Sequence, residues 1–589
     1  MTIFKKYKFQ IALVIATWLC YANTLNHDYA GDDVIVITSN DRVQQGWNGI
    51  PSLFKNIKSD QTQHRYGYRP ISLISFAVDI GAFGLNPFWG HLHNILLYTI
   101  LILVIHCFLS SFFPQFNSWQ TFIITLLFTA HPLHTEVVAN IKSRDEILAM
   151  LFGILSVMNY GKWIKTKNKK YLMLSLLTLV AAFLSKENAI TYVGIFLIFP
   201  FLINSENKIK LSHIITPLIS LILLLGIYKL SLSSLIFEQN SIELFEKGLY
   251  HEDRFSANPL VDISSFLFLF LNSLWLLVLD IKLLHFPYPL AHDYGFNQVE
   301  IITEFTDLRW LIGLCLSIGL IILCIKSLKK NPEACFGILF FIITLSIYLH
   351  LVKIGPDYLG ERFLFAPILG WSICIVWLLS KIPHKLSKAI TLTITIVFVT
   401  LTIQRNKAWK NNLTLYETDL PHLKKCARFH YNYASLLHVN YYSIIDEKTK
   451  QQTKQKILTH YETAYNITER IFKLNMDLGN AYMEFNEPDK AYPIFLKATK
   501  NYSNLSVPYF QLGKYYITKN DFATARKQFS KAIEKGEKNA NTYYYYAICE
   551  LKLGNLNAAI NTLNIGLPYA INNKPYIDLL NKLKNNPTS

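Results

Sequence analysis

Long apolar runs constrain this chain more than any other feature, because each can cross about 30 Å of hydrocarbon. They end near residue 404, and the sequence beyond is more polar. Only 16% of the 589 residues are charged, against about a quarter in soluble proteins. A single soluble domain, a disordered chain and a collagen-like chain are therefore excluded. We predict an all-α protein, with a polytopic membrane helix bundle over residues 1–404 and a soluble domain over residues 405–589.

The apolar runs lie near residues 9–25, 91–113, 119–138, 147–163, 171–184, 188–204, 211–231, 263–284, 308–326, 335–352, 363–380 and 389–404. The first run follows a basic start, as in a signal peptide. It lacks a small-x-small cleavage site, and Trp18 and Tyr21 lie where cleavage would fall. We therefore predict an uncleaved first helix.

Basic loops set the orientation of the predicted spans. The loops 162–170, 205–210, 326–334 and 381–388 are expected in the cytoplasm. Three apolar runs lie between the second and third of these loops, whereas two cytoplasmic loops require an even number of crossings. We predict that 263–284 does not cross and lies at the outer face or re-enters. About eleven spans result, with the N-terminus inside and the C-terminus outside.

The net charge of +17 could indicate nucleic-acid binding. Much of the excess lies in the short basic loops, which is typical of a positive-inside membrane protein, and no Arg-rich stripe is present. We predict no nucleic-acid partner. The eight cysteines lie mostly in apolar runs and form no CxxC pair, so no disulfide framework and no zinc site are expected.

The region after residue 410 contains an internal repeat with the 34-residue period of tetratricopeptide repeats. Six residues recur one period later: Leu478, Gly479, Tyr482, Ala491, Phe495 and Ala498 as Leu512, Gly513, Tyr516, Ala525, Phe529 and Ala532. Three or four such repeats form a short α-solenoid with a concave groove. The solenoid could hold a peptide or protein partner, or serve only packing and assembly.

Polar residues beside membrane helices are costly and are functional candidates. With the predicted orientation, the unusual ones converge on the outer side from several loops. They are Asp32 and Asp33, Tyr68-Arg69-Pro70, His91 and His93, His131-Pro132-Leu133-His134-Thr135-Glu136, Ser143-Arg144-Asp145-Glu146, Ser185-Lys186-Glu187-Asn188, and Asp357, Glu361 and Arg362.

Each of these residues also has an ordinary structural interpretation. The two aspartates could form a solvated turn or a helix cap, and the cations could anchor lipid headgroups or form ion pairs. The histidines could bind a metal, but no known ligand spacing such as HExxH is present. The convergence on one side, rather than any single residue, favours a functional site.

Sugar transfer from a lipid-phosphate carrier suits acids and cations at an outer membrane face. Arg or Lys would bind the donor phosphate and stabilise its charge as it leaves. The acceptor hydroxyl needs one carboxylate as base. Two other classes remain open: a non-enzymatic membrane scaffold that recruits partners through its repeats, and a transporter, which would place polar residues nearer the bilayer midplane.

The order of the motifs resembles the transmembrane and tetratricopeptide-repeat-containing family of protein O-mannosyltransferases, which have a C-type glycosyltransferase membrane fold. The matching pieces are Gly31-Asp32-Asp33, Tyr68-Arg69-Pro70, the His-Pro-x-His-Thr-Glu at 131–136, Ser143-Arg144-Asp145-Glu146-Ile147-Leu148-Ala149, Lys186-Glu187, Asn258-Pro259, Pro287-Tyr288-Pro289 with Asp293-Tyr294, and Glu361-Arg362-Phe363. The resemblance covers nearly the whole chain, because the repeats follow in the expected place.

The resemblance implies an inverting transfer of a sugar, mannose in the family, from a polyprenyl- or dolichyl-phosphate donor to Ser or Thr hydroxyls of proteins. It implies a catalytic base at Asp32 or Asp33, with a slight preference for Asp33. The implied donor-phosphate ligands are Arg144, Lys186 and Arg362. The residues expected to shape the site are Tyr68, Arg69, His131, His134, Glu136, Glu187 and Glu361. No cofactor is implied, and a divalent metal is not expected.

Two departures from the family bear on the substrate and the location. The repeats are few, and the family's Gly-Arg-Ala-Asp reads Ser-Arg-Asp-Glu at 143–146. With the richness in Lys, Ile and Asn, they indicate a bacterial member in the cytoplasmic membrane with its repeats in the periplasm. A eukaryotic member would lie in the ER membrane with lumenal repeats. A bacterial enzyme could also glycosylate a lipid or a polysaccharide.

Overall fold

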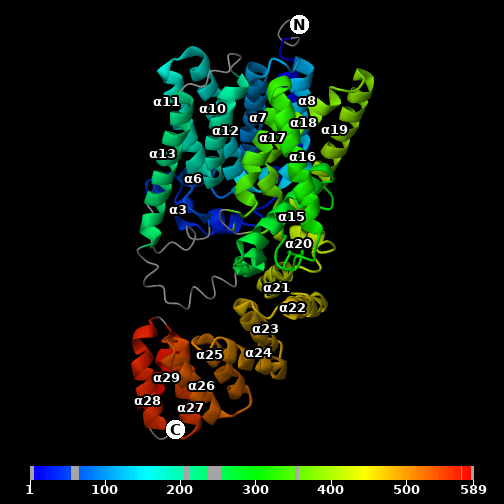
Figure 1. The fold of residues 1–589 in the computed structure, drawn as a ribbon. Coiled ribbons are helices and arrows are strands. Elements are labelled where there is room, and N and C mark those ends of the chain that lie inside the picture. Colours follow the sequence, from blue (N-terminus) through cyan, green and yellow to red (C-terminus); the bar gives the residue numbers. More distant parts are fainter. Residues whose placement is uncertain are drawn as a thin grey trace. The chain divides into compact units, whose positions relative to one another are not determined.

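The computed structural model describes residues 6–54, 66–203, 211–236, 254–351, 355, 357–571 and 573–585. Every regular element in these ranges is helical, which confirms the all-α prediction (Figure 1). The chain divides into two compact units. Of the described residues, the first unit holds those up to Lys424 except two short segments, and the second holds these segments, 254–256 and Phe296–Gln298, together with the residues from Lys425 onward. The predicted cytoplasmic loop 205–210 lies outside the described residues.

The first unit is a bundle of apolar helices. Its main helices are α2 (Lys8–Tyr21), α6 (Pro70–Phe83), α7 (Pro87–Phe112), α8 (Ser118–Ala130), α10 (Arg144–Thr166), α11 (Lys169–Ser185), α12 (Thr191–Ile203), α13 (Leu211–Ile236), α15 (Phe266–His285), α16 (Arg309–Lys330), α17 (Pro332–Leu345), α18 (Pro367–Leu379) and α19 (His384–Asn406). Within the described part of the chain, six helices are long and apolar enough to cross a membrane, or seven if one bent pair counts as a span. The chain is thus a multi-pass membrane protein, and eleven spans remain a prediction.

Three elements differ from the sequence expectation. The run 119–138 is not one helix, because α8 ends at Ala130 and Pro132–Ala139 continues after His131 at a 53° bend. Pro132 explains the break, since the residue before a proline avoids helical angles, and His131 is extended. The helix α15 is unbroken over 20 residues and fits a span by length and composition, so nothing in it supports the exclusion of 263–284.

The third difference is α6, which the sequence analysis did not anticipate. It has 14 residues, or about 21 Å of helix, and is too short for a typical membrane span. Pro70 occupies its first turn, where the missing N–H costs nothing, and Gly84 ends it at a φ of 72°. The helix therefore lies among the loops at the end of the bundle that also carries α3 (Asp41–Gln44) (Figure 1).

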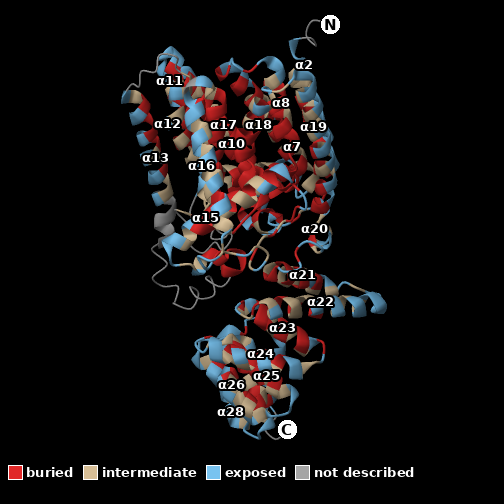
Figure 2. Ribbon diagram, turned by 45° about the vertical axis from the view of Figure 1, so that its right-hand side comes forward, coloured by how far each residue is buried: buried red, intermediate tan, exposed pale blue. Residues whose placement is uncertain are grey.

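The helix α10 lies in the interior of the bundle (Figure 2). Its apolar window is 78% buried, against 17% in α16. Hydrogen bonds join α10 to α11, because the hydroxyls of Ser156 and Ser175 each donate to the other's carbonyl, at 2.7 and 2.9 Å. Small residues allow similarly close packing elsewhere: a Cβ on Gly370 would lie 2.4 Å from the Gly337 carbonyl oxygen. The site motif at the start of α10 is thus held by a rigid, buried helix.

The second unit is a series of helix pairs. Its helices are α21 (Ala427–Tyr441), α22 (Glu447–Ile467), α23 (Phe472–Glu484), α24 (Pro488–Asn501), α25 (Val507–Thr518), α26 (Phe522–Glu534), α27 (Ala540–Lys552), α28 (Leu556–Gly566) and α29 (Lys574–Asn585). A Cβ on Gly479 would meet the ring of Phe495 at 2.3 Å, and one on Gly513 would meet Phe529 at 2.6 Å. The same close approach thus recurs one period apart, as the repeat predicts.

Candidate active site

A network of ion pairs joins three loops at one end of the membrane bundle. Arg69, which precedes α6, contacts Asp145 at 2.7 Å and Glu187 at 2.7 Å. Lys186 contacts Asp145 at 3.3 Å and Glu146 at 2.7 Å. Asp145 and Glu146 lie in the first turn of α10, where carboxylates also favour the helix dipole. The structure thus brings together the Tyr-Arg-Pro, Ser-Arg-Asp-Glu and Lys-Glu motifs.

Arg362 forms a second group of ion pairs beside this network. Its guanidinium contacts Glu136 at 2.5 Å and Asp357 at 2.6 Å. Its backbone N–H also donates to Glu136, at 3.0 Å. The Arg362 side chain is 19% exposed, more than that of Lys186 at 8% or Arg144 at 0%. Of the three cations predicted to bind a donor phosphate, Arg362 is therefore the most accessible.

Asp32 lies on the accessible side of the first loop. Its side chain is 52% exposed, and its carboxylate lies 3.3 Å from the Lys142 ammonium. Desolvation raises the pKa of Asp32, but the charges of Lys142 and Arg362 outweigh it and hold the pKa below its usual range. Asp32 is therefore an ionised carboxylate within reach of solvent.

Asp33 has the opposite environment. It is fully buried, and its carboxylate accepts hydrogen bonds from the backbone N–H groups of Ala30 at 3.0 Å and Lys142 at 2.6 Å. Burial raises the pKa of Asp33 to about 7 in spite of these bonds. Asp33 therefore fixes the loop to the segment before α10, and the slight preference for Asp33 as base has no support in this geometry.

Arg144 is fully enclosed at the start of α10. It contacts Asp79 at 2.7 Å and Asn94 at 2.8 Å, and its remaining N–H groups donate to Ser75 and to the Gly90 carbonyl. The guanidinium is fully buried among these partners, so no open face is left for a phosphate. Arg144 instead ties α10 to α6 and α7.

The predicted histidines are buried among packed side chains. His131 lies 3.1 Å from the Leu284 carbonyl through Nε2 and accepts from the Leu133 N–H through Nδ1 at 3.3 Å. His134 lies 2.7 Å from the Tyr98 hydroxyl. Among the described residues, no group of three or more His, Cys, Asp or Glu is arranged to hold a metal ion. Both histidines therefore act through packing and hydrogen bonding in this arrangement.

Glu361 belongs to a separate buried cluster. It accepts from the Ala291 N–H at 2.6 Å and the Tyr294 hydroxyl at 3.2 Å, and Arg405 lies 3.9 Å away. Burial raises the pKa of Glu361 to about 8. Glu361 thus anchors the turn that presents Arg362 rather than facing the same space. The predicted Tyr68 lies at the periphery, where its hydroxyl donates to the Phe54 carbonyl at 3.2 Å.

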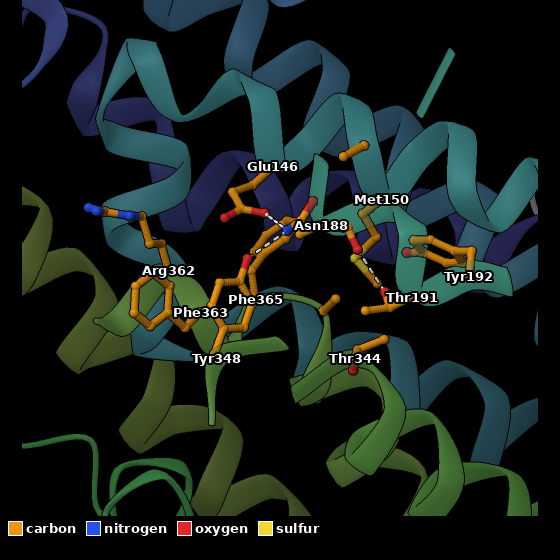
Figure 3. A pocket seen from close by; sticks show the side chains of 12 residues that line it. Glu146, Met150, Asn188, Thr191, Tyr192, Thr344, Tyr348, Arg362, Phe363 and Phe365 are labelled. Carbon is orange, nitrogen blue, oxygen red and sulfur yellow. Dashed lines mark hydrogen bonds between the residues drawn. The ribbon is translucent and has the colours of Figure 1, made fainter. Parts of the chain in front are cut away.

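A cleft opens beside the ion pairs, between α10, α12 and α17 (Figure 3). Its free volume is about 10 Å³, which is room for about one water molecule. Arg362 and Glu146 line it together with Asn188, whose amide donates to Glu146 at 2.8 Å and to the Tyr348 hydroxyl at 2.7 Å. The ring of Tyr348 stacks on another lining residue, Phe363, at 4.3 Å. The cleft therefore has polar walls at Glu146 and Asn188 and aromatic walls at Tyr348 and Phe363, whereas the guanidinium of Arg362 points away from them (Figure 3).

Several residues of the site were not assigned a role from sequence. Five of them lie inside a sequence motif or next to one: Lys142, Asp145, Glu146, Asn188 and Asp357. Their position beside the motifs could therefore have identified them. Tyr348 lies inside the predicted span 335–352, where an aromatic residue carries no functional signal. Only the fold shows that it reaches the cleft.

Comparison with known proteins gives two family matches. Residues 254–321 match the model described as "Protein O-mannosyl-transferase TMTC, DUF1736", and residues 508–534 match the tetratricopeptide repeat. The human protein O-mannosyl-transferase TMTC1 is 27% identical over 504 residues, covering 79% of this chain and 55% of that protein. This chain is similar to the TMTC proteins. The resemblance inferred from the motifs is confirmed.

Other TMTC proteins are also similar to this chain. Mouse TMTC3 is 23% identical over 630 residues, which cover 93% of this chain and 66% of that protein. Human TMTC2 is 29% identical over 329 residues, which cover 53% of this chain and 38% of that protein. The chain thus spans little more than half the length of TMTC1, so the TMTC name alone does not carry over the activity of the whole protein.

Proposed function

We propose that the chain is a membrane glycosyltransferase that moves a sugar, mannose by analogy with the names of its relatives, from a polyprenyl- or dolichyl-phosphate to Ser or Thr hydroxyls of proteins. One observation carries the proposal: an accessible, ionised Asp32 shares one end of the helix bundle with a cluster of cations and a cleft. A scaffold needs no such carboxylate.

Arg362 is our first choice for the donor phosphate. It is partly exposed, it lines the cleft, and its planar guanidinium suits a phosphate group. Lys186 is the second choice, because it lies 2.7 Å from the cleft residue Glu146. A phosphate would replace part of their present carboxylate contacts. Since phosphate is already a stable leaving group, no general acid is required.

Asp32 is our choice for the base. The acceptor hydroxyl attacks C1 of the sugar from the side opposite the phosphate, its proton passes to the Asp32 carboxylate, and the C1–O bond to the phosphate breaks. The lipid phosphate leaves with the electron pair, and the sugar is inverted at C1. Lys142, 3.3 Å from Asp32, keeps the carboxylate ionised before the reaction.

We also propose that the site faces the outer side of the membrane. In a bacterium this is the periplasmic side of the cytoplasmic membrane, and in a eukaryote the lumenal side of the ER. The repeats would lie on the same side and hold the acceptor protein, as tetratricopeptide solenoids suit extended partners.

The proposal is tested by transfer of labelled mannose from dolichyl phosphate mannose to a Ser/Thr-containing protein mixture, with the full chain purified in detergent. We expect transfer by the wild type and a loss of roughly 100-fold or more in Asp32→Asn, with an unchanged melting temperature. The matched control is Asp307→Asn, a partly exposed aspartate paired with Arg309 outside the ion-pair network of the site. Wild-type levels of transfer in Asp32→Asn would remove Asp32 from the mechanism.

A further inference from the structure

Gly31 directly precedes the proposed base Asp32, and its backbone conformation needs a support from outside the loop. Its φ is 58°, in the left-handed region. Glycine adopts positive and negative φ about equally readily, so Gly31 does not fix this angle by itself. A rotation about the bond would turn the chain that follows. The place of the Asp32 carboxylate therefore depends on what holds Gly31.

The residues on either side of Gly31 and Asp32 are held by the segment before α10. The side-chain amide of Asn140 donates to the Ala30 carbonyl at 2.7 Å. The Lys142 N–H donates to the Asp33 carboxylate at 2.6 Å, and that carboxylate also accepts from the Ala30 N–H at 3.0 Å. None of these three bonds involves the N–H of Gly31.

The N–H of Gly31 is bound by a residue from the far end of the helix bundle in sequence. It donates to the side-chain oxygen Oδ1 of Asn412 at 2.6 Å. Because a backbone N–H only donates, the Asn412 amide must present its oxygen here. Asn412 begins α20 (Asn412–Asp419), which follows α19. The same segment holds the loop a second time, because the Lys410 carbonyl accepts from the Asp28 N–H at 2.8 Å.

Buried apolar packing fixes the segment that carries Asn412. Trp409 and Leu415, on either side of Asn412 in sequence, are buried in one cluster with Ala30 and Ala139. Asn412 therefore lies between two anchored side chains. A fixed acceptor can select one φ for a flexible glycine, since any other angle would lose the hydrogen bond.

We infer that Asn412 is a positioning residue for the proposed base: by holding the Gly31 N–H, it fixes the backbone from which the Asp32 carboxylate reaches the acceptor hydroxyl. This inference rests on the function proposed above. It adds to the site a residue that lies 381 positions from Gly31 in the chain.

The test is the mannose-transfer assay described above, with the full chain and initial rates at varied donor for wild type, Asn412→Ala and Asn412→Asp. We expect Asn412→Ala to lower kcat roughly tenfold, because a small misplacement of a reacting group is costly. The donor KM should stay unchanged, since Arg362 and Lys186 are held by other partners. Asn412→Asp keeps an accepting oxygen for Gly31 and should recover most of the rate.

Asn411→Ala is the matched control. The neighbouring Asn411 accepts from the Thr414 N–H at 2.9 Å as the cap of α20, so its loss affects the helix end and not the Gly31 N–H. It should lower the melting temperature slightly and leave kcat unchanged.

Three results would overturn the inference: wild-type kcat in Asn412→Ala, no recovery in Asn412→Asp, or an equal loss of kcat in Asn411→Ala. In each case wild-type transfer and its loss in Asp32→Asn would still support the proposed function. A wild type that does not transfer would overturn both.

Discussion

Arg144 and Arg362 are both paired with carboxylates at the same end of the helix bundle, but the two arginines differ in what they can still bind. Arg144 has a fully buried side chain that pairs with Asp79 and donates to Asn94, Ser75 and Gly90. Arg362 is 19% exposed and borders a cleft. The same residue type therefore holds helices together in one place and stays partly open to solvent in the other.

The same division separates Asp32 from Asp33. The two residues are adjacent in sequence, yet one is half-exposed beside an ammonium and the other is buried against backbone N–H groups. Sequence motifs of this kind thus mix residues that support a site with residues that act in it. Substitutions that affect stability and activity separately can tell them apart.

Arg144→Met should have the largest effect. It leaves Asp79 buried without its guanidinium partner, and breaking such a pair costs about 3–5 kcal/mol in the free energy of unfolding. Thermal unfolding in detergent measures the loss. Arg309→Met removes a partly exposed pair with Asp307 and should cost about 1 kcal/mol in the free energy of unfolding. Equal melting temperatures for the two variants would contradict the structural role of Arg144.

Asp33→Asn should have the second-largest effect and lower the free energy of unfolding by about 1–3 kcal/mol. An amide offers only one accepting oxygen, so either the Ala30 or the Lys142 N–H loses its acceptor in a buried place. The neighbouring Asp32→Asn should keep the wild-type melting temperature, because its carboxylate is half-exposed. A lower melting temperature for Asp32→Asn than for Asp33→Asn would contradict the assignment of Asp33 to the structural role.

Arg362→Lys should change donor recognition more than stability. Lysine keeps a charge beside Glu136 and Asp357 but loses the planar fork that suits a phosphate. We expect KM for the lipid-phosphate donor to rise about tenfold. Initial rates at varied donor and fixed acceptor measure it, with Arg309→Lys as the control. An unchanged donor KM would move the phosphate to another cation, with Lys186 next in order.

Much of the fold could be predicted from sequence because it follows from local composition. The apolar runs gave the helices to within a few residues in most cases, and the 34-residue recurrence gave the repeats. The break at Pro132 was missed although the proline itself was a signal. The helix Pro70–Phe83 was missed although its 14 residues equal the length of the predicted run 171–184.

The site could be located from sequence but not resolved. The order of the predicted spans is enough to bring the loops with Arg69, Lys186 and Arg362 to the same end of the helix bundle. The partners of these cations do not enter that prediction. Which cation remains accessible depends on distant residues such as Asp79, which no local pattern connects to Arg144. Tyr192 and its contact with Gly153 depend on how two helices pack, and a sequence alone does not specify that packing.

The smallest expected effect, acidification from pH 7 to pH 5, distinguishes the two aspartates without any substitution. The pKa of Asp32 is held below its ordinary value of 3.8, so a base at Asp32 stays ionised and the transfer rate should be nearly constant over this range. The pKa of Asp33 is raised to about 7, so with Asp33 as the base the rate would fall roughly 50-fold between pH 7 and pH 5. Protonation of Asp33 at low pH does not unfold the chain, so it does not lower the measured transfer rate by that route. A carboxyl with a raised folded pKa stabilises the fold most at low pH, and that contribution is lost as pH rises through about 7. Initial rates over this range, with tryptophan fluorescence to confirm that the chain stays folded, therefore report the base directly. A steep fall toward pH 5 would return the role of base to Asp33.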